Sequence, residues 1–299
     1  MVSQKQIEEE TRAILKSINK MPPFPAIITK ILNMVQDENY DAKELEEVIL
    51  LDPVITAKCL KLCNSSYFGM RQKIESIQQA IVLIGQKNLL KIIMAAAAGN
   101  LNFNSKGLWM HSVSVAILSQ LVFDHVKADT TIKNVFDNNS EFTLYTSSLL
   151  HDIGKIVLDQ FIERDYHKVE ILQVQGMCNC SEIEKQLYGV NHSVIGSEIL
   201  KKWGFPDSLQ IPVKLHHTVF NKMDEKPITA IHIAHILGIS DLLHLSFLWC
   251  ENFSEVIIEQ KILDLFHLTP DNLLTLKYEL HKQLSETNEL LQLDSELDD

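Results

Sequence analysis

The sequence predicts an all-α fold, and three observations support that prediction. Apolar residues recur at the three- and four-residue spacing of a helix face along nearly the whole chain. Alternation typical of strands is scarce. The 299 residues include only 10 Gly and 8 Pro, so few positions interrupt helices. A chain of this length can form one large helical domain or two modest ones, with enough core to fold without disulfides.

The first hundred residues predict short helices with clear start signals. Asp41 and Ser76 are residues that cap helix N-termini, and Asp52-Pro53 places a capping Asp before a Pro at the first helical position. Pro22, Pro23 and Pro25 are expected to separate the first two helices. The helices expected here cover about residues 4–18, 25–35, 41–49, 53–64, 76–84 and 86–98.

The polar, Gly- and Asn-rich segment 99–107 is the best internal boundary. It divides an amino-terminal lobe (1–100) from a second lobe (101–250), with carboxy-terminal helices and an acidic tail in 251–299. Gly154 is expected to end a helix that carries His151-Asp152. The other helices expected here begin near Leu108 or cover about 158–175, 181–188, 192–203, 207–218, 227–245, 254–266 and 270–291.

The formal net charge is −12, from 27 basic and 39 acidic residues. This balance argues against a nucleic-acid binder, which needs a basic face. The last fifteen residues hold six of the acidic residues, and removing these fifteen residues would leave a net charge of −6.

The polar start and the odd number of Cys, five, favour a cytoplasmic protein with reduced thiols. The apolar stretch 228–249 contains three His and an Asp, so it is expected to be a buried core helix and not a membrane span.

Twelve His carry the chemical interpretation. His151-Asp152 and His216-His217 are adjacent pairs, and His111 and His192 lie singly on amphipathic helices. Imidazoles with one carboxylate suit Zn, Fe, Mn, Co or Ni, and no single metal is specified. A carboxylate between several His can bridge two metals and support phosphoester hydrolysis. The alternative, that each His only caps or packs, is about as consistent with the pattern.

The same residues resemble a known family. His111, His151-Asp152-Ile153-Gly154-Lys155, His192 and His216-His217 follow in the order of the metal ligands of the HD superfamily of phosphohydrolases, especially its HD-GYP branch. The amino-terminal motifs resemble the HDOD domain, the HD-related output domain of bacterial signalling proteins. These motifs are Met21-Pro22-Pro23-Phe24-Pro25, Asp52-Pro53, Asn64-Ser65-Ser66-Tyr67-Phe68-Gly69 and Ser76-Ile77 through Gly85. The resemblance covers about residues 15–240 and implies a two-lobed, HD-like helical bundle.

The resemblance also implies a ligand set. One metal would be held by His111, His151, Asp152 and His235; a second would share Asp152 with His192, His216 and His217. The superfamily's last ligand is normally an Asp on a late helix, and here its place is assigned to His235. Asp241 is the alternative, six residues on and about 240° further round the helix. His232 lies on the face of His235 and stays undecided.

Lys155 would steady a phosphate oxygen or the group that attacks it, beside Asp152 as the other catalytic residue. A helix-end Lys paired with solvent or a carboxylate is the equal alternative. The remaining His, at positions 125, 167, 244, 267 and 281, are expected to be surface or packing residues.

Two functions follow from the resemblance. The first is a signal-transduction output module that binds a mono- or dinuclear divalent metal centre and a signalling partner. The second is a metal-dependent phosphohydrolase acting on a nucleotide or other phosphoester. A metal or redox sensor is a third hypothesis.

Many HDOD proteins have lost the metal ligands that this chain keeps. Residues 218–222 lack the Gly-Tyr-Pro motif, so cyclic di-GMP hydrolysis is not supported. Metal identity, substrate and oligomeric state stay open.

Overall fold

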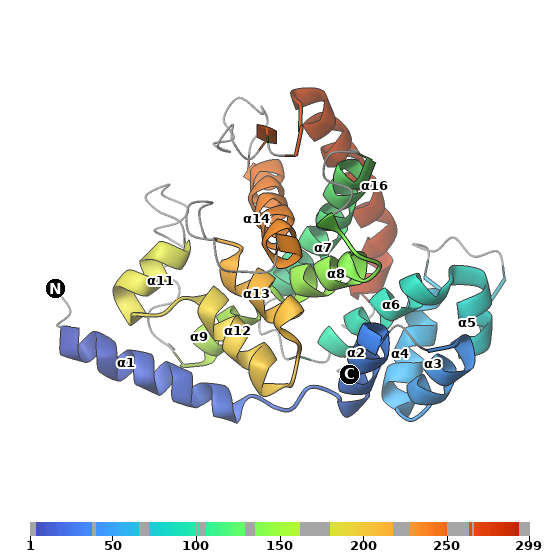
Figure 1. Ribbon diagram of the computed structural model, residues 1–299, viewed down its shortest axis with the longest axis horizontal. Helices are drawn as coiled ribbons and strands as arrows, with labels where there is room; N and C mark the ends of the chain where they lie inside the picture. Colours follow the sequence, from blue (N-terminus) through green and yellow to red (C-terminus); the bar gives the residue numbers. More distant parts are fainter. Residues whose placement is uncertain are drawn as a thin grey trace.

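The computed structural model describes residues 4–37, 40–65, 72–99, 101, 106–128, 135–161, 180–217, 228–249, 263–264 and 266–292. These segments form helices and no strand, which confirms the all-α prediction (Figure 1). The helices are α1 Gln4–Ser17, α2 Ala26–Asp37, α3 Ala42–Ile49, α4 Pro53–Cys63, α5 Ile77–Ile84, α6 Gln86–Ala98, α7 Lys106–Ala128, α8 Ser140–Leu150, α9 Ile153–Phe161, α11 Cys180–Tyr188, α12 His192–Lys202, α13 Asp207–Leu215, α14 Ile228–Trp249 and α16 Pro270–Gln292, with a 3-10 turn, η1, at Ile18–Lys20.

The amino-terminal start signals act as the sequence predicts. The Asp41 side chain accepts hydrogen bonds from the backbone N–H groups of Lys43 and Glu44. The Glu44 carboxylate accepts one from the backbone N–H of Asp41, which completes a capping box. Asp52 caps α4 ahead of Pro53, and Ser76 caps α5. The first N–H groups of these helices have no acceptor within the helix, and side chains close in the sequence accept their hydrogen bonds.

Asn64 closes the turn between α4 and α5. Its side-chain amide donates to the carbonyls of Leu60 and Ile74, and its oxygen accepts the N–H of Ile74. This side chain therefore replaces backbone pairing across a ten-residue connection. Ser66 to Gly69, the rest of the motif, lie outside the described residues.

The first helix packs against helices of the second half of the chain. α1 contacts α9 and α11, along the lower edge of the second half of the chain (Figure 1). The Lys202 ammonium then donates to the carbonyls of Ile18, Asn19 and Met21, and the Trp203 indole N–H donates to Pro22. The end of α12 thus holds the chain where it crosses towards α2. The lobe division at residue 100 remains a prediction, and α1 contacts the second lobe.

Two apolar clusters form the core. The larger runs from Ile14 to Val213 and joins α2–α6 to α8, α9, α12 and α13. The smaller is built from α7, α14 and α16 with residues that precede α16. Ile236, Leu237 and Leu243 of α14 are buried in it, as expected for a core helix. No helix in the described segments has the length and apolarity to span a membrane.

The segment around Gly154 departs from the sequence prediction. α8 ends at Leu150 and α9 begins at Ile153, so Gly154 lies in the first turn of a new helix instead of ending the previous one. A side chain at this position would meet the backbone of α12, because a Cβ on Gly154 would lie 2.0 Å from the carbonyl oxygen of His192. Gly154 thus permits the close crossing of α9 and α12. The predicted helices at 158–175 and 254–266 lie mostly outside the described residues.

Candidate metal centre

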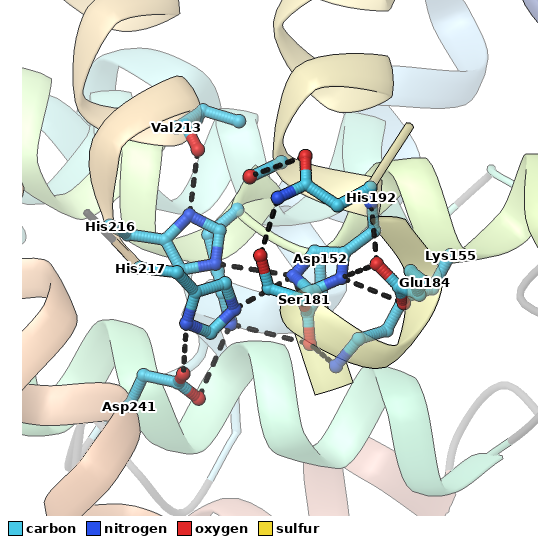
Figure 2. Close-up of polar contacts among 12 residues, drawn as sticks. Asp152, Lys155, Ser181, Glu184, His192, Val213, His216, His217 and Asp241 are labelled. Atoms are coloured by element: carbon cyan, nitrogen blue, oxygen red, sulfur yellow. Dashed lines mark hydrogen bonds and ion pairs between the residues drawn. The ribbon is translucent and has the colours of Figure 1, made fainter. Parts of the chain in front are cut away.

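Helix ends bring most of the candidate ligands together. His151 and Asp152 lie between α8 and α9, and His216 and His217 directly follow α13. His192 is the first residue of α12, where the Asn191 side chain caps the helix. α7 and α14, which pack against each other, supply His111 and Asp241. Figure 2 shows most of these side chains converging on one point.

One group of ligand atoms surrounds His111. Its Nε2 lies 3.2 Å from Nε2 of His151, 3.3 Å from Oδ2 of Asp152 and 3.0 Å from Oδ1 of Asp241. His151, Asp152 and Asp241 are buried, and the side chain of His111 is 13% exposed. We call this group the first subsite.

A second group surrounds His192. Its Nε2 lies 3.4 Å from Nε2 of His216, 2.9 Å from Nε2 of His217 and 3.2 Å from Oδ1 of Asp152. We call this group, His192, His216 and His217, the second subsite. Asp152 therefore presents one carboxylate oxygen to each subsite.

The outer nitrogens of three of these imidazoles face hydrogen-bond acceptors. Nδ1 of His151 lies 2.7 Å from the carbonyl of Ser148, and Nδ1 of His216 lies 2.6 Å from that of Val213. Nδ1 of His192 lies 2.7 Å from the carboxylate of Glu184 (Figure 2). An acceptor at Nδ1 requires a proton there, so in each neutral ring Nε2 carries the lone pair.

This arrangement fits a cation. Oδ1 of Asp152 is buried and receives no hydrogen bond from the described residues, since its neighbour, Nε2 of His192, is itself an acceptor. Burial lowers the pKa of His216 and that of His217, the latter to about 3, so these rings are neutral at physiological pH. Neutral imidazoles and carboxylates whose free electron pairs converge are the donors that divalent transition metals prefer.

The first subsite attracts a proton when no metal neutralises it. Burial disfavours the charged form of His151, but the carboxylates of Asp152 and Asp241 outweigh this and raise its pKa to about 10. The pKa of Asp241 lies well below its ordinary value despite burial, because His111 and His151 surround it. A metal at this subsite must therefore displace the proton of His151.

Metal binding is consequently expected to release protons and to strengthen with pH. The pKa of His151 is about 10, so the metal-free folded protein keeps the His151 proton at lower pH. A bound ion should therefore release about one proton between pH 7 and 9. Calorimetric titration in two buffers of different ionisation enthalpy measures this number, with the metal titrated into a chelator as control. Identical heats in both buffers, after that correction, would contradict the expectation.

Lys155 lies against the centre and not in solvent. Its Nζ is 2.6 Å from Oδ2 of Asp152, and its side chain is 20% exposed. Burial disfavours its charge, yet the Asp152 carboxylate raises the pKa of Lys155 above its ordinary value. The cation therefore pairs with Asp152, the carboxylate alternative left open by the sequence.

The structure places the two candidates for the last ligand differently. His235 is not brought to the cluster: its ring centroid lies 6.2 Å from that of His232 and 6.4 Å from that of Phe266. Asp241, further round α14, points to the centre instead, with Oδ1 3.7 Å from Nε2 of His151 and Oδ2 4.0 Å from Nδ1 of His217. Packing of α14 on α7 and α13 sets which face meets the site.

Two supporting residues were missed from the sequence. His244, expected to be incidental, is buried with its Nδ1 2.9 Å from Nδ1 of His111. Its spacing of three from Asp241 on one helix was a usable signal. Glu184, which holds His192, is fully buried and had no local signal, because it lies among other polar residues of α11.

The helical bundle and its His/Asp cluster define an HD-related class of protein, and comparisons with known proteins specify the family. The family model of the HDOD domain matches residues 21–219, and the chain belongs to that family. Motif positions on both sides of the cluster, from Met21 to His217, fall within the match.

Solved structures share the fold. An HDOD domain protein of unknown function from Geobacter sulfurreducens superposes with a TM-score of 0.73 at 19% identity, covering 97% of this chain and 98% of that one. A proposed phosphohydrolase from Shewanella amazonensis SB2B gives a TM-score of 0.68 at 21% identity, covering 93% and 98%. An uncharacterized protein of Treponema pallidum is 21% identical over 239 residues. That alignment includes 76% of this chain but only 45% of the Treponema pallidum protein, so this chain spans less than half of the length of that relative.

Proposed function

We propose that this HDOD chain binds divalent transition-metal ions at the His/Asp cluster, one or two per chain, and acts as a cytoplasmic signal-transduction output domain towards a protein partner. The observation that carries metal binding is the fixed orientation of His151, His192 and His216. Acceptors behind each ring turn its Nε2 towards the other candidate ligands of the cluster. Its family membership supports the signalling role.

Elemental analysis of untagged protein tests the metal centre. We expect at least one Fe, Mn, Zn, Ni or Co per chain after dialysis against metal-free buffer. Less than about half an ion per chain, also after reconstitution with each of these metals, would overturn the proposal.

Hydrolysis of a phosphoester is the second candidate, and the exposure of the centre favours it. The side chains of His111 and His217 are each 13% exposed and that of Lys155 is 20% exposed, whereas His151 and His192 are fully buried. Solvent therefore meets the cluster where its cation and two imidazoles lie, and a small anion could approach there. A bound ion would supply Lewis acidity and lower the pKa of a water that it binds. Asp152 would hold the two subsites in register, and Lys155 would orient a phosphate oxygen.

Replacing Asp152 with Asn tests that candidate. If the centre hydrolyses an aryl phosphodiester, the rate should fall at least about 100-fold, the scale on which loss of a group that stabilises the transition state acts. Asp159→Asn on the neighbouring helix α9 is the matched control. Equal rates for wild type and the Asp152 variant would assign the activity to a contaminant.

A further inference from the structure

The two subsites differ in the charge of the groups that surround them. Asp152 serves both, but the first subsite also has the Asp241 carboxylate, 3.0 Å from His111. The second subsite adds three imidazoles, all uncharged when they offer lone pairs, and one of them, His216, also lies within 4.8 Å of a carboxylate oxygen of Asp241. A divalent ion at the second subsite therefore meets less negative charge from its direct ligands.

Glu184 supplies the missing charge from behind the ligands. It is fully buried on α11, and its two carboxylate oxygens lie 2.9 and 2.7 Å from Nδ1 of His192. The second of these oxygens also accepts the backbone N–H of His192, at 2.7 Å. These contacts fix both the start of α12 and the orientation of the ring.

The groups that face the outer nitrogens of His111, His151 and His216 are two backbone carbonyls and another imidazole. Backbone carbonyls of Ser148 and Val213 face His151 and His216, and His244 faces His111. None of these three groups is a carboxylate. Among the groups within hydrogen-bonding distance of an outer nitrogen of the ligand imidazoles in the described segments, the carboxylate is that of Glu184, at the second subsite; the carboxylate of Asp241 lies 4.0 Å from Nδ1 of His217.

We propose that Glu184 is the positioning residue that enables the second subsite to hold a divalent ion, an inference that rests on the proposed metal centre. A carboxylate that accepts a hydrogen bond from the Nδ1–H group increases the basicity of Nε2 and fixes the orientation of the ring towards the metal. It also places a negative charge beside a cluster of neutral ligands. The first subsite, with Asp241, does not depend on it.

Metal stoichiometry of Glu184→Gln is the test. Gln has nearly the same size and keeps one acceptor oxygen, so the charge is the main loss. We expect wild type to bind two ions and the variant to bind one tightly, with the second bound about 10- to 100-fold more weakly. Glu182→Gln, an exposed position on the same helix, is the matched control and should bind two ions.

Two further measurements separate charge from folding. Without metal, Glu184→Gln should unfold at the wild-type temperature or above, while its stabilisation by added metal should be smaller. Glu184→Asp, which keeps the charge on a shorter side chain, should weaken the second ion less than Gln does. The Asp variant keeps the test decisive if the Gln variant fails to fold.

The outcomes are distinguishable from failure of the proposed function. Absence of metal in wild type overturns the metal centre itself. One ion in wild type, or two equally tight ions in Glu184→Gln, overturns the role of Glu184 and leaves metal binding intact. An Asp variant as weak as the Gln variant also overturns it, because charge would then not be the cause.

Discussion

Asp241→Asn is expected to abolish tight metal binding at the first subsite, whereas His235→Gln should leave it unchanged. Asp241 is 4% exposed, and its Oδ1 lies 3.0 Å from Nε2 of His111 and 3.7 Å from Nε2 of His151. Asn keeps the shape but removes the charge, and its NH₂ group cannot bind a cation. The loss should exceed the roughly 10- to 100-fold that removal of an outer hydrogen-bond partner costs.

The same variant has a consequence without metal. Asp241 is one of the two carboxylates that raise the pKa of His151 to about 10, so in Asp241→Asn that pKa should fall. NMR titration of the imidazole C–H signals measures the shift, and competition with a chromophoric chelator measures metal affinity. Retained affinity in Asp241→Asn, together with its loss in His235→Gln, would restore the original assignment of the last ligand.

Features of the fold that depend on residues close together in the sequence could be predicted from the sequence. Caps at Asp41, Asp52 and Ser76 were predicted correctly because a capping side chain bonds to N–H groups two or three residues away. The contact of α1 with α9 and α11 could not be predicted in this way. It involves groups far apart in the chain: the Thr11 hydroxyl of α1 donates to the carbonyl of Tyr188 at the end of α11, and Lys202 and Trp203 hold the segment that follows α1.

In the candidate site, too, motif order could be read from the sequence, whereas contacts set by helix packing could not. Motif order identified six of the residues that the structure brings together: His111, His151, Asp152, His192, His216 and His217. The seventh choice, His235, lies near His232 and Phe266 instead, because packing on α7 and α13 sets the face of α14 that meets the cluster. Glu182 and Glu184 look alike in the sequence, yet one is exposed and the other is fully buried against His192.

Gly154→Ala is expected to destabilise the protein strongly, against the direction that helix propensity predicts. Gly154 lies in the first turn of α9, where Ala would favour the helix by up to about 1 kcal/mol if nothing opposed it. The new Cβ, however, would lie 2.0 Å from the carbonyl oxygen of His192 and 2.9 Å from the N of Gly196. Both are backbone atoms, so no side-chain rotation relieves the clash.

Relief requires α9 and α12 to separate, at a cost of about 3 kcal/mol, the upper part of the usual range for overpacking. The movement would also draw His192 from Asp152, now 3.2 Å apart, so metal binding should weaken with stability. Gly196→Ala on α12 is the matched control. Its Cβ would press on the side chains of Val213 and Ile153, at 3.2 and 3.3 Å, and the nearby backbone N of Gly154 would lie at 3.5 Å, an ordinary van der Waals distance. Urea unfolding of the metal-free proteins should rank wild type above Gly196→Ala and Gly154→Ala last. A Gly154→Ala protein as stable as wild type would mean that the two helices do not cross this closely, and that the cluster is not held together by their contact.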